Sequence, residues 1–228
     1  QDQLKKNKRL IEKKNEITSV ICDVCLAYNI KLIYISSIQV YKDYGINNLS
    51  INSKINLKNP YSKSHYDSEK IILEKFLNYK KMFIILRMGN VFGFTKYNNS
   101  KDIDSNLIHS LCNVALKKEK ILINNGYIRR TFIPSQIFVK VINSIIKKNF
   151  LKNLIINISY KNLNLKDIAH IIQKRFELAF NLHINIIIKK FSYNKNFSIY
   201  SNQNFKFNPI NKKIYNEIDQ ILKLIKKN

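Results

Sequence analysis

Short apolar runs alternate with longer segments of helical periodicity along this chain of 228 residues. Two runs, Lys31-Leu-Ile-Tyr-Ile-Ser36 and Met82-Phe-Ile-Ile-Leu-Arg87, are typical of strands buried on both faces of a sheet. Further strands are predicted over residues 121–123, 128–133, 154–158 and 184–189. Helices are predicted over residues 5–28, 61–79, 103–118, 134–148, 165–177 and 212–227. Two segments are predicted to be irregular, 41–59 and 191–209.

The alternation of helices with short apolar strands indicates an α/β fold with a mainly parallel sheet. The Asn125-Gly126 pair is a turn signal between two of the predicted strands. Glycine is otherwise rare, with four residues in the chain and a single close pair, Gly89 and Gly93. The chain therefore contains no G-x-G-x-x-G dinucleotide loop and no phosphate-binding Walker motif.

Basic side chains outnumber acidic ones, with 40 Lys and Arg against 15 Asp and Glu and a formal net charge of +25. A basic excess of this size is one sign of a polyanion partner. However, only five of the 40 are arginine, the residue on which nucleic-acid readers depend, and the lysines are spread from Lys5 to Lys227. We attribute the charge to an Asn-, Ile- and Lys-rich composition of the kind that AT-rich codons produce. We therefore expect no nucleic-acid partner, and keep a polyanion-binding module as a less favoured alternative.

The cysteines do not indicate a redox or metal site. Cys22 and Cys25 have C-x-x-C spacing, but both lie on one face of a predicted helix and no second pair follows, so we interpret them as core residues. The histidines show no ligand spacing, and no metal is predicted. A sparse, odd cysteine content fits a reducing cytoplasm. No apolar run approaches the roughly 18 residues of a membrane span, so we predict a cytoplasmic protein without membrane association.

Three short segments carry the candidate chemistry. They are Ile35-Ser-Ser-Ile-Gln-Val-Tyr41 at a strand end, Asn59-Pro-Tyr-Ser-Lys-Ser-His65 at a helix start, and Leu86-Arg-Met-Gly-Asn-Val-Phe-Gly93 after the next strand. In a parallel sheet all three lie at, or just after, the carboxyl ends of strands, where ligands bind in such sheets. We therefore expect these segments to line one site.

The order and spacing of these segments resemble the extended short-chain dehydrogenase/reductases, the NAD-dependent sugar-nucleotide epimerase/dehydratase family, and within it the UDP-glucose 4-epimerase-like proteins. Ser37 and Tyr61 resemble the family's catalytic hydroxyl and tyrosine. Arg87 and Asn90 resemble its substrate-contacting Arg-x-x-Asn, and Arg130-Thr-Phe-Ile resembles the segment whose arginine grips the diphosphate. The resemblance implies as catalytic residues Ser37, Tyr61 and His65; as cofactor-binding residues Ser36, Tyr61, His65 and Gly89; and as substrate-binding residues Ser37, Asn90, Asn106, Leu107 and Arg130.

The resemblance also implies a reaction. An epimerase or related reductase of a nucleotide-activated sugar moves hydride to and from NAD, or alternatively NADP, while Tyr61 exchanges the proton of the sugar hydroxyl. A tyrosine can do this when its pKa lies well below its ordinary value of about 10, which a nearby cation brings about. Ser37 then holds the sugar oxygen, and Arg130 contacts the phosphates. A homodimer through helices near 10–28 and 61–79 is implied as well.

By the same resemblance, the fold is the later part of a Rossmann-type sheet joined to a small interleaved substrate domain. Residues 1–93, with returns near 128–158, are assigned to the remainder of the NAD-binding domain. Residues 94–127 and 159–228 are assigned to the substrate-binding domain. The family's amino-terminal βαβ units are absent, and the resemblance of Asn15 to a family asparagine in the helix before the serine strand implies roughly 80 residues ahead of Gln1, enough for two such repeats.

Several positions depart from the family's pattern. His65 stands where the family has the lysine four residues after its tyrosine, and Tyr66-x-x-x-Lys70 offers a less favoured alternative match. Ile38-Gln39 replaces the Asp-Glu of the dehydratase branch, which disfavours a 4,6-dehydratase, and Thr131 replaces an aspartate. His65 and the missing glycine loop keep a second hypothesis open, a non-catalytic truncated or decayed homologue.

Overall fold

The computed structural model describes residues 2–41, 49–57, 59–77, 79, 82–93, 107–118, 120–148, 153–190 and 210–227. The helices are α1 (Asp2–Ala27), the 3-10 turn η1 (Ile38–Val40), α2 (Pro60–Leu77), α3 (Leu107–Lys118), α4 (Ser135–Lys148), α5 (Leu165–Phe180) and α6 (Asn211–Lys227). The strands are β1 (Leu32–Ser37), β2 (Phe83–Met88), β3 (Asn90–Phe92), β4 (Lys120–Asn125), β5 (Arg129–Pro134), β6 (Leu154–Ile158), β7 (Lys161–Asn164) and β8 (Asn185–Lys190).

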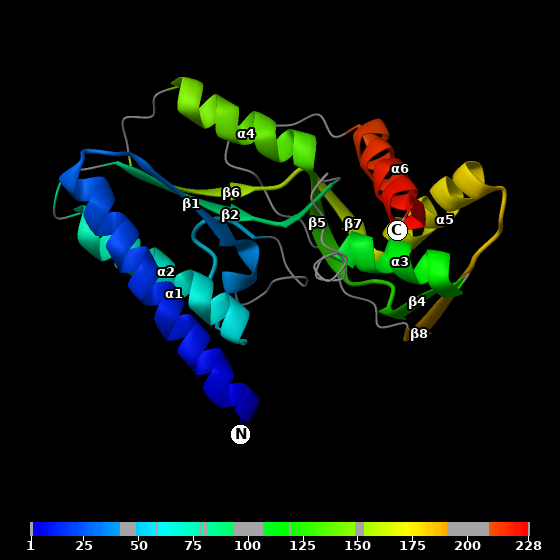
Figure 1. Ribbon diagram of the computed structural model, residues 1–228, viewed down its shortest axis with the longest axis horizontal. Coiled ribbons are helices and arrows are strands. Elements are labelled where there is room, and N and C mark those ends of the chain that lie inside the picture. The colour runs from blue at the N-terminus through cyan, green and yellow to red at the C-terminus, as the bar shows by residue number, and fades with distance from the viewer. Residues whose placement is uncertain are drawn as a thin grey trace.

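The predicted parallel α/β architecture is confirmed. A three-stranded sheet has the order β1-β2-β6 with both pairs parallel, and a second has the order β3-β5-β7 with a parallel and an antiparallel pair. A separate parallel pair joins β4 to β8. In Figure 1 the first sheet with α1, α2 and α4 forms one end of the molecule, and α3, α5, α6, β4 and β8 form the other. The boundaries of the two predicted domains stay a prediction.

The β1-β2-β6 sheet divides the apolar core because alternate side chains point to opposite faces. Phe83 and Ile85 of β2 pack with Cys22 and Cys25 of α1 on one face. Leu86 and the other alternate residues of β2 join the larger core on the face that α4 covers. The interpretation of Cys22 and Cys25 as buried core residues is thus confirmed, and both thiols are free.

The other end of the molecule has a core rich in isoleucine. Ile214, Ile218 and Ile221 of α6 are fully buried, and they belong to the same cluster as Ile108 of α3 and Ile121 of β4. Burial of each such side chain is worth about 1.5–3 kcal/mol relative to exposure. The described helices contain none that is long and apolar enough to cross a membrane.

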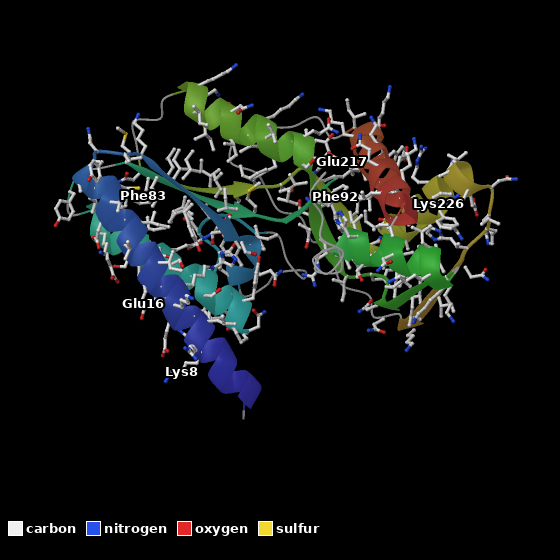
Figure 2. All side chains as sticks on the ribbon, viewed as in Figure 1. Lys8, Glu16, Phe83, Phe92, Glu217 and Lys226 are labelled. Atoms are coloured by element: carbon white, nitrogen blue, oxygen red, sulfur yellow. The ribbon has the colours of Figure 1, made fainter. Side chains whose placement is uncertain are left out.

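The two ends meet where α4 and α6 approach each other. Figure 2 labels Phe92 and Glu217 in this region, and Phe92 packs edge-on against Phe132 with ring centroids 6.3 Å apart. The Ser135 hydroxyl at the start of α4 donates to Glu217 Oε1 of α6 at 2.7 Å. The packing leaves no room for a side chain at Gly93, because a Cβ there would lie 2.3 Å from the Ser135 Oγ.

Three features differ from the sequence prediction. The short strands β3 and β7 were not predicted, and both pair with β5. Asn125-Gly126 does end a strand, but the strands on either side of it pair elsewhere, β4 with β8 and β5 with β3 and β7. β1 is only partly buried, and Ile35 is 38% exposed, because β1 is the outermost strand of its described sheet.

Candidate active site

A cavity of about 460 Å³ lies at the carboxyl ends of β1 and β2, beside the start of α2. It draws its lining from the three segments expected to meet. Seven of the predicted site residues line it: Ser36, Ser37, Tyr61, His65, Gly89, Asn90 and Leu107. The other lining residues lie in the same quoted segments but were not assigned a site role; they are Ile35, Ile38, Gln39, Met88 and Val91. Most of these flank predicted residues along the same strand ends.

The two adjacent serines of β1 have different roles, because neighbouring strand residues point to opposite faces. The Ser36 hydroxyl donates to Glu69 Oε1 of α2 at 2.5 Å and is therefore engaged within the protein. The Ser37 Oγ accepts from the Gln39 backbone N–H at 3.2 Å and so caps the 3-10 turn η1. No described residue accepts the Ser37 hydroxyl hydrogen, which leaves it able to donate to a ligand oxygen.

Tyr61 is placed by the local sequence that starts α2. The Asn59 side chain accepts from the Ser62 backbone N–H at 2.8 Å, as a helix cap does, and Pro60 supplies a backbone suited to the first helical position. Tyr61 follows at the mouth of the cavity with 52% of its surface exposed. Its ring lies edge-on to the His65 ring, with centroids 4.6 Å apart.

His65 is partly buried and uncharged at neutral pH. Burial, and next the positive charge of Lys14, lower the pKa of His65 to about 4. The His65 Nδ1 lies 3.3 Å from the Tyr34 hydroxyl of β1, so its polar partner is a neutral group. His65 thus does not place a cation at the position where the family has lysine.

Gly89 and Asn90 are fixed by close contact with β5. A Cβ on Gly89 would lie 2.0 Å from the Thr131 Cγ2, so no side chain fits at this position. The Asn90 Nδ2 donates to the Thr131 carbonyl oxygen at 3.2 Å. Thr131 is fully buried, and its hydroxyl lies 2.7 Å from the Ser159 hydroxyl. The threonine that replaces the family's aspartate is therefore part of the packing beneath the cavity floor.

A buried ion pair connects the elements that carry the site. The Arg87 guanidinium of β2 donates to Glu69 of α2, from Nε to Oε1 at 3.1 Å and from a terminal nitrogen to Oε2 at 2.6 Å. Arg87 also donates to the Tyr41 hydroxyl at 3.0 Å, which donates to the Asn157 Oδ1 at 2.7 Å. Burial lowers the pKa of Arg87, but the hydrogen bonds and charge of Glu69 outweigh it and raise the pKa overall.

This ion pair corrects one expectation. Arg87 was expected to contact substrate together with Asn90, yet it is 4% exposed and its guanidinium faces Glu69, which is fully buried. Arg87 points to the face of the sheet opposite Leu86 and Met88, away from a ligand in the cavity. The signal available in the sequence was Glu69 itself, an acidic residue in the apolar stretch of a helix.

Two other predicted residues lie elsewhere. Arg130 lies in β5 opposite Leu163 of β7 and is not among the residues that line the cavity. Asn106 falls outside the described residues. The alternative tyrosine, Tyr66, packs against the cluster of Ile38 and its neighbours, and the Lys70 ammonium lies 5.7 Å from its ring centroid. Neither residue of this alternative pair lines the cavity.

Comparison with known proteins assigns the family. The model of the NAD dependent epimerase/dehydratase family matches residues 1–159, which is more than half of the chain. The chain belongs to this family. A curated member, the dTDP-D-glucose 4,6-dehydratase of Dictyostelium discoideum, is 27% identical over 150 residues, covering 60% of this chain and 33% of that protein. The chain thus spans one third of the length of this curated relative.

Solved structures of epimerases share the fold. The UDP-Glc/GlcNAc 4-epimerase of Campylobacter jejuni is 15% identical with a TM-score of 0.75, over 100% of this chain and 74% of that one. The UDP-glucose 4-epimerase of Bifidobacterium longum, in complex with NAD+ and UDP, is 19% identical with a TM-score of 0.71, over 92% and 68%. The UDP-N-acetylglucosamine 4-epimerase of Methanobrevibacter ruminantium M1 is 21% identical with a TM-score of 0.68, over 90% and 66%.

The residues around the cavity suit the nicotinamide end of NAD, the cofactor that the family's description names. Hydroxyl, phenol and imidazole groups gather around a space that suits a nicotinamide and its ribose, whose hydroxyls need hydrogen-bond partners. The sequence contains no glycine loop of the kind that cradles the diphosphate of a dinucleotide. The residues of this chain therefore match the reacting end of NAD and not its diphosphate.

Proposed function

We propose that this protein acts in the NAD-dependent epimerisation, or a related reduction, of a nucleotide-activated sugar. The observation that carries the proposal is the convergence of Ser37, Tyr61 and Asn90, from three separate segments, on one cavity at the carboxyl ends of two parallel strands. This is the place where ligands bind in open parallel sheets.

In the proposed reaction Tyr61 exchanges a proton with a sugar hydroxyl. NAD, when bound, would supply the hydride acceptor and donor for the carbon of that hydroxyl. The Ser37 hydroxyl donates to the sugar oxygen and fixes its distance from the Tyr61 phenol. Asn90, which donates to the Thr131 carbonyl oxygen, also lines the cavity and is a candidate to contact the ligand. Arg130 remains a candidate for phosphate contacts, although it lies outside the described cavity.

We favour epimerisation or reduction over 4,6-dehydration. Elimination of water needs an acid and a base near the sugar. In this chain the two residues after Ser37 are Ile38 and Gln39, which both line the cavity and have no ionisable side chain. The curated relative is a dehydratase, but 27% identity over one third of its length supports the family and not the reaction.

We further propose a homodimer through α1 and α2. These helices lie side by side, joined by the Lys75 ammonium, which donates to the Ser19 carbonyl oxygen at 3.4 Å. The outer face of α1 exposes an apolar stripe at helical spacing, Ile17, Val20, Ile21 and Val24, which Tyr28 continues just after the helix. Such a stripe is typical of an interface between subunits. Light scattering of the protein and of a Val20→Asp variant tests this, because the variant is expected to be monomeric.

The experiment that tests the function is a turnover assay on protein expressed from the complete gene. UDP- and dTDP-linked hexoses and N-acetylhexosamines are supplied with NAD, the corresponding keto-sugar nucleotides are supplied with NADH in a parallel assay, and the products are separated by chromatography. A change of configuration without net NADH release supports epimerisation, and net NADH oxidation supports reduction. If a 4-keto-6-deoxy product forms instead, the preference against dehydration is wrong.

If the protein turns over none of these sugar nucleotides, the result would favour the second hypothesis, a homologue without catalytic activity. Two observations support that hypothesis: His65 is neutral where the family has a cation, and the sequence lacks a glycine loop. Binding measurements distinguish the two. A non-catalytic homologue that has kept its cavity binds a sugar nucleotide without turnover, whereas a decayed one binds none.

A further inference from the structure

The surroundings of His65 determine what this residue offers to a ligand. Its Nδ1 lies 3.3 Å from the hydroxyl of Tyr34, a residue of β1 that points toward α2 like Ser36 two positions later. His65 also lines the cavity, and no described residue binds its Nε2. Because Nδ1 faces Tyr34, Nε2 is the ring nitrogen that remains to contact a ligand.

A phenol is a much better proton donor than a neutral imidazole, and an imidazole nitrogen is a much better acceptor than a phenol oxygen. The contact is therefore a hydrogen bond from the Tyr34 hydroxyl to the His65 Nδ1. Burial raises the pKa of Tyr34 to about 12, so the phenol keeps its proton throughout the neutral range. A neutral imidazole that accepts at Nδ1 carries its hydrogen at Nε2.

Charged groups around the pair favour the same neutral state. From α1, the Lys14 ammonium donates to the Ser64 hydroxyl at 3.3 Å and lies 6.0 Å from the Tyr34 ring centroid. Its positive charge opposes protonation of His65. From α2, the carboxylate of Glu69 is neutralised by Arg87. Ser68, the other hydroxyl near Tyr34, donates to the Ser64 carbonyl oxygen at 3.1 Å and accepts from Thr18 at 3.2 Å.

We propose that Tyr34 is a positioning residue that holds His65 in the Nε2–H tautomer, so that His65 serves as a neutral hydrogen-bond donor toward the cavity. The acceptor is a ligand hydroxyl or the Tyr61 oxygen. This inference rests on the proposed function only for the identity of the ligand, since the tautomer belongs to the protein alone. His65 would then supply a hydrogen-bond donor where the family has lysine, but it would not supply the positive charge of that lysine.

The direct test is nitrogen NMR of protein labelled with 15N-histidine, because long-range correlations distinguish the two neutral tautomers and the cation. A His65→Gln variant assigns the His65 signals among the four histidines. We expect the Nε2–H form at pH 7, unchanged down to about pH 5. Tyr34→Phe is expected to give a mixture of tautomers, while Tyr66→Phe, on a tyrosine that packs elsewhere, is expected to give the wild-type spectrum.

An Nδ1–H tautomer or a cation at pH 7 in the wild-type protein would overturn the proposal, even if Tyr34→Phe failed to fold. An unchanged tautomer in a folded Tyr34→Phe variant would overturn the role of Tyr34. NADH binding by protein expressed from the complete gene is the second readout. His65→Ala is expected to bind NADH about 3- to 10-fold more weakly than the wild type, and His65→Gln, whose amide NH₂ can replace the Nε2–H donor, is expected to bind more tightly than His65→Ala. If the tautomer is as expected but neither the wild type nor any variant binds NADH, the proposed function fails and the tautomer assignment stands.

Discussion

Two clusters of arginine, carboxylate and tyrosine lie in the two ends of the molecule. In the first, Arg87 binds Glu69 at 2.6 Å with its guanidinium 5.0 Å from the Tyr41 ring centroid. In the second, Arg175 of α5 binds Asp219 of α6 at 2.5 Å, and its guanidinium lies 5.6 Å from the ring centroid of Tyr215, one turn before Asp219 on α6. The first ion pair is 5% and 0% exposed, and the second is 26% and 23% exposed.

The difference lies in what each cluster holds in place. The buried pair connects β2 to α2 and, through Glu69 and Ser36, to β1, so it fixes three elements that line the cavity. The partly exposed pair joins two helices whose contact is already made by apolar residues such as Ile218 and Ile172. Similar chemistry therefore positions the candidate site at one end of the molecule and merely adds to packing at the other.

The largest expected effect is that of removing one partner of the buried pair. Glu69→Gln leaves Arg87 charged and without a counterion in the protein interior, which is expected to lower the free energy of unfolding by about 3–5 kcal/mol. Glu74→Gln, on an exposed residue of the same helix, is expected to change it by less than about 0.5 kcal/mol. Urea denaturation measures both. Equal effects of the two substitutions would refute the positioning role of the pair.

A smaller effect is expected from the pH dependence of stability. Because the pKa of His65 falls to about 4 on folding from an ordinary 6.5, the unfolded chain binds a proton between these values that the folded chain does not. Stability contributed by neutral His65 is present above pH 6.5 and is lost as the pH falls toward 4. Urea denaturation at pH 7 and pH 4.5 is expected to show a loss greater by roughly 1–2 kcal/mol in the wild type than in His65→Gln. The same loss in both would contradict this account.

The smallest effect is expected at the partly exposed pair of Arg175 and Asp219. Arg175→Met is expected to lower the free energy of unfolding by about 0.2–1 kcal/mol, because solvent and salt screen the charges. Raising the salt concentration should reduce the difference between this variant and the wild type. If Arg175→Met lowered the free energy of unfolding as much as Glu69→Gln, burial would not explain the difference between the two clusters.

The sequence located most elements because their apolar periodicity is strong. The run before Arg87 is a strand whose residues are all buried, and the helix at Pro60 begins where its cap and proline indicate. The strands β3 and β7 have three and four residues, and their pairing with β5 depends on register that no local pattern reveals. Tertiary contact, and not local propensity, forms these strands.

The candidate site was predictable to the level of segments but not of every side chain. Ser37, Tyr61 and Asn90 converge because parallel strands end at one edge of a sheet. The partners of those segments come from distant positions, as with Tyr34, which is 31 residues from His65 in sequence. Arg87 matches a recognisable motif but forms an ion pair with Glu69, because its position in β2 directs its side chain to the face of the sheet opposite Leu86 and Met88.

The account depends most on Tyr61 as the acid/base of the cavity, and one comparison tests this directly. Turnover of a sugar nucleotide by protein expressed from the complete gene is measured in single-turnover experiments for the wild type, Tyr61→Phe and Tyr66→Phe. Loss of a proton-transferring group is expected to slow the chemical step by about 10²–10⁴-fold in Tyr61→Phe, with unchanged substrate affinity. Tyr66→Phe is expected to retain the wild-type rate. A Tyr61→Phe variant with the wild-type rate, or a loss confined to Tyr66→Phe, would contradict the assignment.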